Sequence, residues 1–193
     1  MIEMNNVSVN YGNTKVLNDF SITVNKGEKI ALMGPSGSGK TTVLKLIGNQ
    51  LQPVSGKVIC HANKIGYMFQ EPRLVPWLTA AENVNLVLGD TPETLPQAIK
   101  WLESLGLGDA VNKYPSELSG GMQQRTALAR TLAYDPDLLL LDEPFSALDE
   151  DMAENILSLV KAYTRDKTVI LVTHNSNHAK QFADTIYILK NRS

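Results

Sequence analysis

The chain has 193 residues, which is enough for one well-buried core and too few for two independent domains. Its 18 Lys and Arg stand against 20 Asp and Glu, giving a net charge of -2, and no run of basic residues occurs; this argues against a nucleic-acid-binding protein. A hydrophobic fraction of 43% is ordinary for a globular protein. The single cysteine, Cys60, excludes an internal disulfide, favours a reducing compartment, and is interpreted as a small core residue.

The sequence predicts neither a secretory leader nor a membrane-spanning helix. The opening stretch, MIEMNNVSVNYG, lacks both a basic segment and an apolar core. The longest apolar run, residues 138–141, is strand-sized, whereas a spanning helix needs about 20 apolar residues. If the protein works at a membrane, another chain must therefore hold it there.

The first third of the chain reads as strands around one helix. Apolar residues alternate over residues 2–9, and SITVN follows at 21–25, which predicts a small antiparallel sheet. GEKIALMG, 27–34, predicts a buried strand that enters a glycine-rich turn. The apolar stripe of TTVLKLIGNQLQP, 41–53, predicts a helix that ends before the proline, and a second β stretch is expected over 56–69.

The middle of the chain, from about residue 78 to 134, predicts helices and no convincing strand. Its helical segments are TAAENVNLVLG, LPQAIKWLESLG and GGMQQRTALARTLA. This block is interpreted as a helical subdomain, 78–134, inserted into an α/β core with a β subdomain formed by 1–77 and 135–193. The whole chain, 1–193, is then a single domain.

The last part of the chain returns to strands. DLLLLDEP, 137–144, and KTVILVTH, 167–174, are apolar runs typical of parallel strands covered on both faces. A helix at about 149–165 joins them, and DTIYILK, 184–190, predicts a last strand.

A phosphate-binding loop is predicted at residues 34–41. GPSGSGKT fits G-x-x-x-x-G-K-[ST] and lies between an apolar strand and a helix, as such loops require. Its amides would face the phosphates of ATP, Lys40 would reach the β- and γ-phosphates, and the Thr41 hydroxyl would bind Mg²⁺. The alternative is a glycine turn that binds nothing. The residues assigned to the nucleotide here are Gly34, Pro35, Ser36, Gly37, Ser38, Gly39, Lys40, Thr41 and Thr42.

Two further segments contain candidate catalytic or anion-binding groups. Asp142, at the end of DLLLLDEP, can hold a magnesium-bound water, and Glu143 could polarise an attacking water; the alternative is a buried strand that merely ends in solvated acids. LSGGMQQR, 118–125, places two glycines at the start of a predicted helix, where unpaired amides form a second anion site.

In this order along nearly the whole chain, the motifs resemble those of the nucleotide-binding subunit of ATP-binding cassette (ABC) transporters. The resemblance implies an α/β fold, a P-loop NTPase (RecA-like) core with a small antiparallel β subdomain and an inserted α-helical subdomain, and an ATP hydrolase. The motifs that carry it are the loop at 34–41, Gln70 in YMFQEP, the signature at 118–125, LLLLDEP at 138–144, SALD at 146–149 and His174 in VTHN.

The resemblance also implies roles for single residues. Tyr11 would stack on adenine, although a strand-end tyrosine is the alternative. Gln70 would contact Mg²⁺ and water, while the loop of residues 72–77 faces a transmembrane partner. Glu143 would be the general base and His174 would sense the γ-phosphate; without the family, a lone histidine after a strand is more often structural.

In the family two cassettes pair head to tail, so that Ser119, Gly120 and Gly121 of one close over the ATP of the other, and Asp149 reaches across the dimer. The sequence itself shows only a glycine-opened helix N-terminus. The implied partners are a second ABC ATPase subunit, forming a homodimer when ATP is bound, integral membrane permease subunits and, indirectly, a solute-binding protein. Nucleic acid is not among them. The expected location is cytoplasmic, peripheral on the cytoplasmic face of the cell membrane.

FQEPRLVPWLTAAENV, 69–84, resembles the importer branch that handles nitrate, sulfonates, taurine and similar small anions or heterocycles, which implies import of a small anion or similar solute. The chain departs from that branch in a shorter β stretch between residues 56 and 70 and in ending at 193 without further helices. The solute stays open, and Arg73 is either a partner contact or a solvated loop charge. The alternative function is a soluble non-transport ABC ATPase that acts as an assembly or regulatory module. His61, His178 and the methionines carry no signal.

Overall fold

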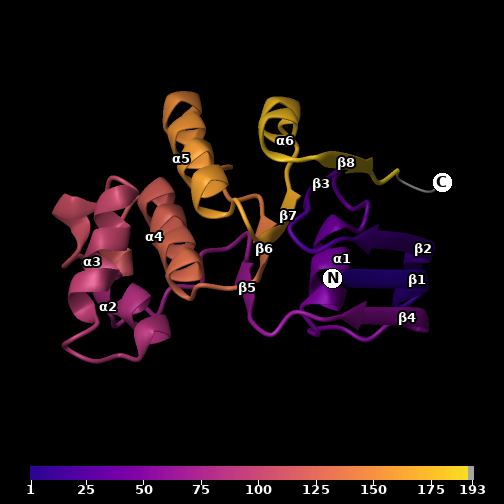
Figure 1. The fold of residues 1–193 in the computed structure, drawn as a ribbon, viewed down its shortest axis with the longest axis horizontal. Coiled ribbons are helices and arrows are strands. Elements are labelled where there is room, and N and C mark those ends of the chain that lie inside the picture. Colours follow the sequence, from indigo (N-terminus) through magenta and orange to yellow (C-terminus); the bar gives the residue numbers. More distant parts are fainter. Residues whose placement is uncertain (191–193) are drawn as a thin grey trace.

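The computed structural model describes residues 1–190, and within that range it contains two sheets (Figure 1). The smaller sheet is antiparallel, in the order β2-β1-β4. Its strands are β1 (Ile2–Tyr11), β2 (Thr14–Val24) and β4 (Ser55–Cys60). The predicted antiparallel sheet is present, although β2 begins well before residue 21.

The apolar alternation of β1 changes phase part-way along the strand. Ile2 and Met4 are buried, but the next buried apolar residues are Val7 and Val9. The register with β2 shifts between Met4 and Val7, where Asn6 has a φ of 50°. A β-bulge adds one residue to a strand, so the later pair returns to the face of the earlier pair.

The larger sheet is parallel throughout the described residues, in the order β5-β6-β7-β3-β8. Its strands are β3 (Lys29–Met33), β5 (Ile65–Met68), β6 (Leu138–Asp142), β7 (Thr168–Val172) and β8 (Thr185–Ile188). Every residue of β6 and β7 is buried, as expected for parallel strands covered on both faces.

Alternate residues of β6 enter two different hydrophobic cores. Leu138 and Leu140 pack with residues of α1 (Lys40–Ile47) and of the smaller sheet. Leu139 and Leu141 pack with residues of α5 (Glu150–Tyr163). Figure 1 shows β6 and β7 between these two helices. The two cores fix the carboxyl ends of the central strands, where the predicted site lies.

The prediction of one β stretch over residues 56–69 is wrong, because the chain changes sheets within it. β4 belongs to the smaller sheet and β5 to the larger. Between them, the Asp137 carboxylate accepts hydrogen bonds from the backbone amides of Asn63 (2.9 Å) and Lys64 (2.6 Å). This contact starts β5 beside β6.

Two helices differ from the sequence expectation. α1 ends at Ile47 rather than shortly before Pro53, because Gly48 follows as its C-cap and Asn49 has a left-handed φ of 55°. No prediction covers α6 (Ser176–Phe182), a short helix whose first amides are bound by the Asn175 side chain. The helix expected near 149–165 corresponds to α5.

The segment from residue 78 to 134 is helical, and its described residues form no strand. Its elements are α2 (Ala80–Asn85), η1 (Leu86–Leu88), α3 (Leu95–Ser104), η2 (Gly108–Ala110), η3 (Pro115–Glu117) and α4 (Gly120–Ala133). Apolar residues of these helices share one core with the α5 face of the larger sheet, so the division into a subdomain at 78–134 stays a prediction. None of the helices in residues 1–190 is long and apolar enough to cross a membrane.

Candidate functional site

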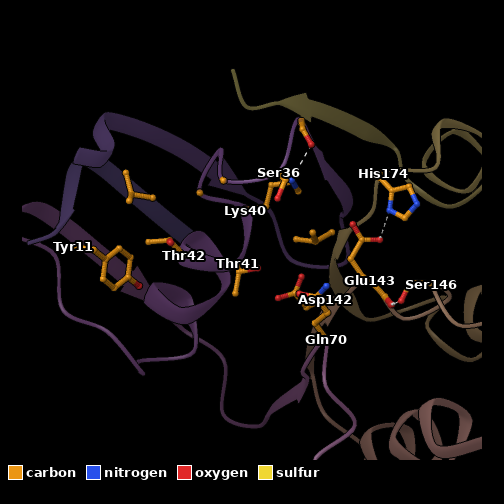
Figure 2. A pocket seen from close by; sticks show the side chains of 15 residues that line it. Tyr11, Ser36, Lys40, Thr41, Thr42, Gln70, Asp142, Glu143, Ser146 and His174 are labelled. Atoms are coloured by element: carbon orange, nitrogen blue, oxygen red, sulfur yellow. Dashed lines mark hydrogen bonds and ion pairs between the residues drawn. The ribbon is translucent and has the colours of Figure 1, made fainter. Parts of the chain in front are cut away.

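A cavity of about 510 Å³ opens where β3, β6 and β7 end, the edge at which parallel sheets bind ligands (Figure 2). It brings together most of the predicted site residues. Those that line it are Tyr11, Gly34, Ser36, Gly37, Gly39, Lys40, Thr41, Thr42, Gln70, Asp142, Glu143 and His174. Val16, Ser146 and Val172 also line it, and none of the three was assigned to the site from the sequence.

The loop of residues 34–39 joins β3 to α1 and needs glycine at two positions. Gly34 has a φ of 144°, and a Cβ there would lie 2.2 Å from the carbonyl oxygen of Leu189. Gly39, the N-cap of α1, has a φ of 96°, and a Cβ there would lie 2.8 Å from Leu17 Cδ2. α1 therefore begins at the cavity, where its first amides and its dipole favour an anion.

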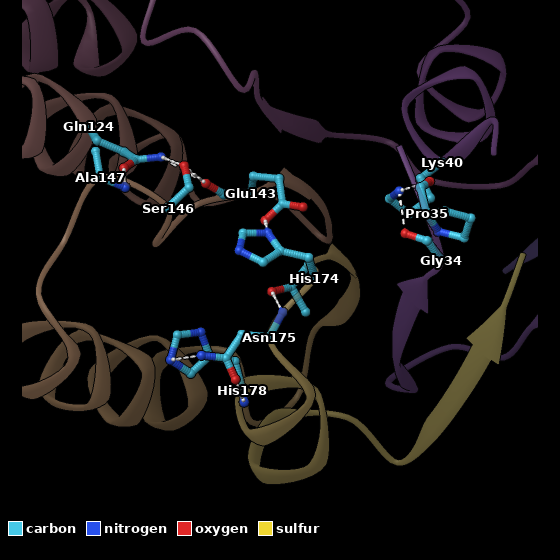
Figure 3. Close-up of polar contacts among 11 residues, drawn as sticks. Gly34, Pro35, Lys40, Gln124, Glu143, Ser146, Ala147, His174, Asn175 and His178 are labelled. Atoms are coloured by element: carbon cyan, nitrogen blue, oxygen red, sulfur yellow. Dashed lines mark hydrogen bonds and ion pairs between the residues drawn. The ribbon is translucent and has the colours of Figure 1, made fainter. Parts of the chain in front are cut away.

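Two polar side chains at this loop are informative, Ser38 within it and Lys40 at the start of α1. The Lys40 ammonium donates to the carbonyl oxygens of Gly34 and Pro35, each at 2.8 Å, so the lysine is held against the loop (Figure 3). The Ser38 hydroxyl is buried and has no hydrogen-bond partner among the described residues. A buried polar atom without a partner is costly, so a phosphate oxygen that accepts from it would fit this loop.

Asp142, Thr41 and Gln70 offer oxygen atoms to one part of the cavity. Asp142 is 2% exposed, and burial raises the pKa of its carboxyl, with the charge of Glu143 adding to the effect and the Thr41 hydroxyl and nearby lysines opposing it. A buried carboxylate gains from a nearby cation, and carboxylate, hydroxyl and amide oxygens suit Mg²⁺. No described group of three His, Cys, Asp or Glu side chains could hold a metal, so phosphates and water would supply the remaining ligands.

Glu143 and His174 contact one another at the strand ends. His174 Nδ1 lies 3.0 Å from Glu143 Oε2, and the two side chains come from the segments after β7 and β6 (Figures 2 and 3). Glu143 has a φ of 50°. The other described non-glycine residues with positive φ are Asn or Asp, apart from Arg73. Left-handed backbone is unfavourable for Glu and is found where surrounding contacts impose it, often at functional sites.

Tyr11 lies at the end of β1, at the rim of the cavity. It is 47% exposed, and an aromatic ring at this rim could stack on a planar group. Val16, on β2, lines the same rim and offers no polar group. The position fits a nucleobase whose phosphates lie in the loop of residues 34–41.

Among the predicted site residues, Pro35, Ser38, the signature residues 119–121 and Asp149 do not line this cavity. Ser119 is the N-cap of α4 and accepts a hydrogen bond from the Met122 amide at 3.3 Å. Gly120 has open space around it among the described residues, whereas a Cβ on Gly121 would lie 2.9 Å from the carbonyl oxygen of Ala147. Asp149 caps α5. Their contact with a nucleotide stays a prediction.

Arg130, on α4, is a residue that the motif search does not single out. Its guanidinium donates to the carbonyl oxygens of Pro72 (2.9 Å) and Arg73 (3.1 Å), and burial lowers its pKa. The Asn83 side chain binds the backbone of the same loop. The Arg73 guanidinium lies 3.9 Å from the ring centroid of Phe69. The loop that follows Gln70 is therefore tied to α4 and α2.

His178 also has contacts that the sequence does not predict. It is 4% exposed, its Nε2 lies 3.3 Å from Asn175 Nδ2, and its ring packs edge-on against Phe145. Only the tertiary structure brings these segments together, so no local pattern marks the histidine. Cys60, by contrast, is partly buried against the core of the smaller sheet, as its interpretation expects.

The geometry can be compared with known proteins. The family model described as ABC transporter matches residues 17–146, more than half of the chain. The chain belongs to the ABC transporter family. This ABC ATPase is 43% identical over 192 residues to the uncharacterized ABC transporter ATP-binding protein YtlC of Bacillus subtilis (strain 168), across 93% of the chain and 74% of the relative.

Relatives with named solutes and a solved structure agree with this assignment. The chain is 39% identical to the aliphatic sulfonates import ATP-binding protein SsuB 1 of Shouchella clausii (strain KSM-K16), over 100% of the chain and 78% of the relative. It is 41% identical to the taurine import ATP-binding protein TauB of Pelagibacter ubique (strain HTCC1062), over 91% of the chain and 71% of the relative. The dimeric post-hydrolysis structure of the ATP-binding cassette MJ0796, bound to ADP and Pi, superposes with a TM-score of 0.90 at 34% identity, covering 100% of this chain and 97% of that one.

These matches confirm three expectations from the sequence. The ABC ATPase has a P-loop NTPase fold, it binds ATP, and it is an ATP hydrolase. The roles of single residues, the divalent ion and the solute are taken up as proposals below.

Proposed function

We propose that this ABC ATPase drives an importer, in which two copies close over ATP and move a small anion or similar solute through a separate integral membrane permease. The observation that carries the proposal is the cavity, because it unites the phosphate loop, the buried Asp142 carboxylate and the contact between Glu143 and His174. Relatives named as importers of aliphatic sulfonates and taurine support the class of solute.

Nucleotide binding would use the loop and its flanks. The amides at the start of α1, the Lys40 ammonium and the buried Ser38 hydroxyl would bind the β- and γ-phosphates, while Tyr11 stacks on adenine. Thr41, Gln70 and Asp142 would hold Mg²⁺, whose bound charge neutralises part of that of the phosphates. The raised pKa of Asp142 supports this assignment, since a cation restores the ionised form.

Hydrolysis would be carried by the two side chains in contact. The Glu143 carboxylate would accept a proton from the attacking water, as a general base does. His174 Nδ1, 3.0 Å from Glu143 Oε2, would donate to the carboxylate and hold it in one orientation. To bind the γ-phosphate as well, the second ring nitrogen must also carry a proton, because phosphate oxygens accept hydrogen bonds. The strand ends of β6 and β7 fix both groups, because β6 and β7 are paired up to Asp142 and Val172.

The second anion site at the start of α4 would act on the nucleotide of a second copy. Gly120 is open to an approaching phosphate among the described residues, and residues 119–121 are absent from the lining of the cavity in their own chain. Asp149, at the start of α5, would reach across the same interface. The dimeric structures of the MJ0796 cassette support this arrangement.

The energy of this contact is suited to a switch. A helix N-terminus contributes about 0.3–1 kcal/mol toward an anion, and up to about 2 kcal/mol in a partly buried geometry. Since about 1.4 kcal/mol is tenfold, one such contact favours ATP over ADP by up to about thirtyfold, and two symmetric contacts square the factor. If the open and closed dimers otherwise have nearly equal free energies, closure would depend on ATP and opening on hydrolysis.

The permease would dock on the loop that follows Gln70. Trp77 on this loop is 75% exposed. Tryptophan is enriched among the residues that contribute most of the binding energy at protein interfaces. Arg130 fixes the preceding carbonyls, so movement of α4 would move the loop. The subunit would then lie on the cytoplasmic face of the membrane and meet a solute-binding protein only through the permease.

The catalytic part of the proposal is tested by Glu143→Gln. We expect the variant to keep ATP bound and to accumulate as a dimer in size-exclusion chromatography, with little hydrolysis. Glu154→Gln is the matched control, because Glu154 is an exposed residue on α5, and it should hydrolyse ATP like the parent. Parental turnover in Glu143→Gln would remove Glu143 from the role of general base.

The transport part is tested in native membranes. We expect the chain to copurify with an integral membrane protein, and Trp77→Ala to release it by weakening binding about thirtyfold or more, the loss of about 2 kcal/mol expected for a central interface residue. Ile188→Ala, which removes another strongly exposed apolar side chain, should leave the complex intact. Recovery of the parent free of any membrane protein would favour the non-transport alternative.

A further inference from the structure

A buried amide connects the signature helix to the segment that carries the proposed base. Gln124, on α4, is 2% exposed. Its Nε2 donates to the carbonyl oxygen of Glu143 at 2.7 Å and to Ser146 Oγ at 3.2 Å, and its Oε1 accepts from the Ala147 amide at 2.8 Å (Figure 3). All three partners lie in the turn between β6 and α5.

These contacts require an amide rather than another polar group. The side chain donates at one end and accepts at the other, which a carboxylate or an apolar side chain of equal length cannot do. The Ser146 hydroxyl also donates to the carbonyl oxygen of Glu143, at 3.0 Å. The Ser146 amide donates to the same oxygen at 3.3 Å, so this carbonyl accepts three hydrogen bonds, and Gln124 supplies the shortest.

The carbonyl that Gln124 binds belongs to a residue with an unfavourable backbone conformation. Glu143 has a φ of 50°, and its own amide donates to the carbonyl oxygen of Val172 at 3.0 Å. Left-handed backbone is unfavourable at such a residue and persists where surrounding contacts impose it. The Val172 carbonyl holds the Glu143 amide, while Gln124 and Ser146 hold its carbonyl. Together these contacts fix the direction in which the Glu143 side chain leaves the strand.

α4 also approaches the same turn through its backbone. A Cβ on Gly121 would lie 2.9 Å from the carbonyl oxygen of Ala147, so only glycine permits the observed distance. Gln124 follows Gly121 by three residues and lies on the same face of the helix. The start of α4 is thus docked on the turn at two points.

We propose that Gln124 is a positioning residue of the ATPase, whose amide holds Glu143 in its left-handed conformation and so aims the carboxylate at the attacking water. The inference rests on the role proposed for Glu143. Because Gln124 lies one turn after residues 119–121, a displacement of α4 by the second nucleotide reaches the base of the first site through this amide.

The test is Gln124→Glu, which keeps the shape and removes the donor. We expect kcat to fall ten- to hundredfold, since small misplacements of catalytic groups cost about that much, while the dissociation constant for ATP changes less than threefold. Asn85→Asp is the matched control: Asn85 is a buried amide on α2 that binds Thr91 and Thr94, far along the chain from the turn. It should keep the parental kcat, and an equal fall in kcat in both variants would overturn the proposal.

A double-mutant cycle separates this inference from the role of Glu143. If Gln124 acts through Glu143, Gln124→Glu slows the residual single-turnover rate of Glu143→Gln less than twofold. A tenfold further loss would show that Gln124 acts elsewhere and would overturn the inference alone. A parental rate in Glu143→Gln would instead remove the base itself. Gln124→Met, which adds no buried charge, replaces Gln124→Glu throughout if the acidic variant does not fold.

Discussion

The two glycines of the signature have different surroundings, which yields a prediction that needs no second copy of the chain. Gly120 has no described atom within 4 Å of an added Cβ, whereas Gly121 would meet the Ala147 carbonyl oxygen at 2.9 Å and Leu148 Cδ2 at 3.3 Å. Both are in the first turn of α4, so replacement by alanine changes helix propensity by a similar amount, at most about 1 kcal/mol. The difference in unfolding free energy between the two variants therefore measures the cost of the steric contact at Gly121.

That steric cost can be estimated. A contact below 3.0 Å with a backbone atom cannot be relieved by rotating a side chain, so α4 or the turn must move. Overpacking of this kind costs about 1–3 kcal/mol. We expect Gly121→Ala to be less stable than Gly120→Ala by about that amount, which for a midsized domain corresponds to a few degrees in Tm.

The assay is urea unfolding of the two variants and the parent, with ATP hydrolysis and ATP binding measured on the same samples. Gly120→Ala should be as stable as the parent or more stable, because alanine favours the helix, and its monomer should bind ATP like the parent. It should nevertheless lose hydrolysis, because its methyl group would stand where the phosphate of the second copy approaches. Equal stability of the two variants would refute the steric reasoning. Loss of ATP binding by the Gly120→Ala monomer would refute the assignment of this glycine to the second nucleotide.

The remaining predictions concern single contacts. Ser38→Ala should leave the free energy of unfolding unchanged or higher, since the hydroxyl has no described partner. It should weaken ATP binding about two- to tenfold in titration calorimetry, which corresponds to the loss of one hydrogen bond. Unchanged affinity would contradict a contact between Ser38 and phosphate. Arg130→Met should lower the free energy of unfolding, measured by urea titration, by about 1.5–3 kcal/mol, because the carbonyl oxygens of Pro72 and Arg73 lose a charged donor. A free energy equal to that of the parent would show that water replaces the guanidinium. Asp135→Asn should cost less than about 1 kcal/mol at pH 7, since the carboxylate is solvent-exposed. Hydrogen bonds from Lys167 and Tyr163 lower the pKa of Asp135 below its ordinary value of 3.8, so this stabilisation exists above pH 3.8 and disappears as the pH falls through the lowered pKa; a loss that persists at acid pH in urea titrations would exclude the ion pair as its cause.

Local patterns were sufficient wherever one segment determines its own structure. The loop at residues 34–41 follows from its glycines and the flanking apolar runs, and the parallel strands β6 and β7 follow from their continuous apolar sequence. The phase change in β1 is also visible in the spacing of its apolar residues, once a bulge is allowed.

Contacts between distant segments account for what the sequence could not supply. The break between β4 and β5 is set by Asp137, which lies more than seventy positions further along the chain than the two amides it binds. The signature motif marks the segment that contains Gln124 but not the role of its side chain, and Arg130 belongs to no motif; the partners of both residues belong to other elements. α6 is short and depends on the Asn175 cap. Such residues are recognised only when the fold brings their partners to them.

The exposed ring of Tyr11 bears on which nucleotide the subunit consumes. Under its proposed role, the base is held by stacking at the rim, where the neighbouring Val16 offers no hydrogen bond to the edge of the base. Stacking is tolerant of base identity because every base presents a π face. Selectivity between adenine and guanine would then be weak, and the relative concentrations of ATP and GTP in the cell, rather than the protein, would decide which one is hydrolysed.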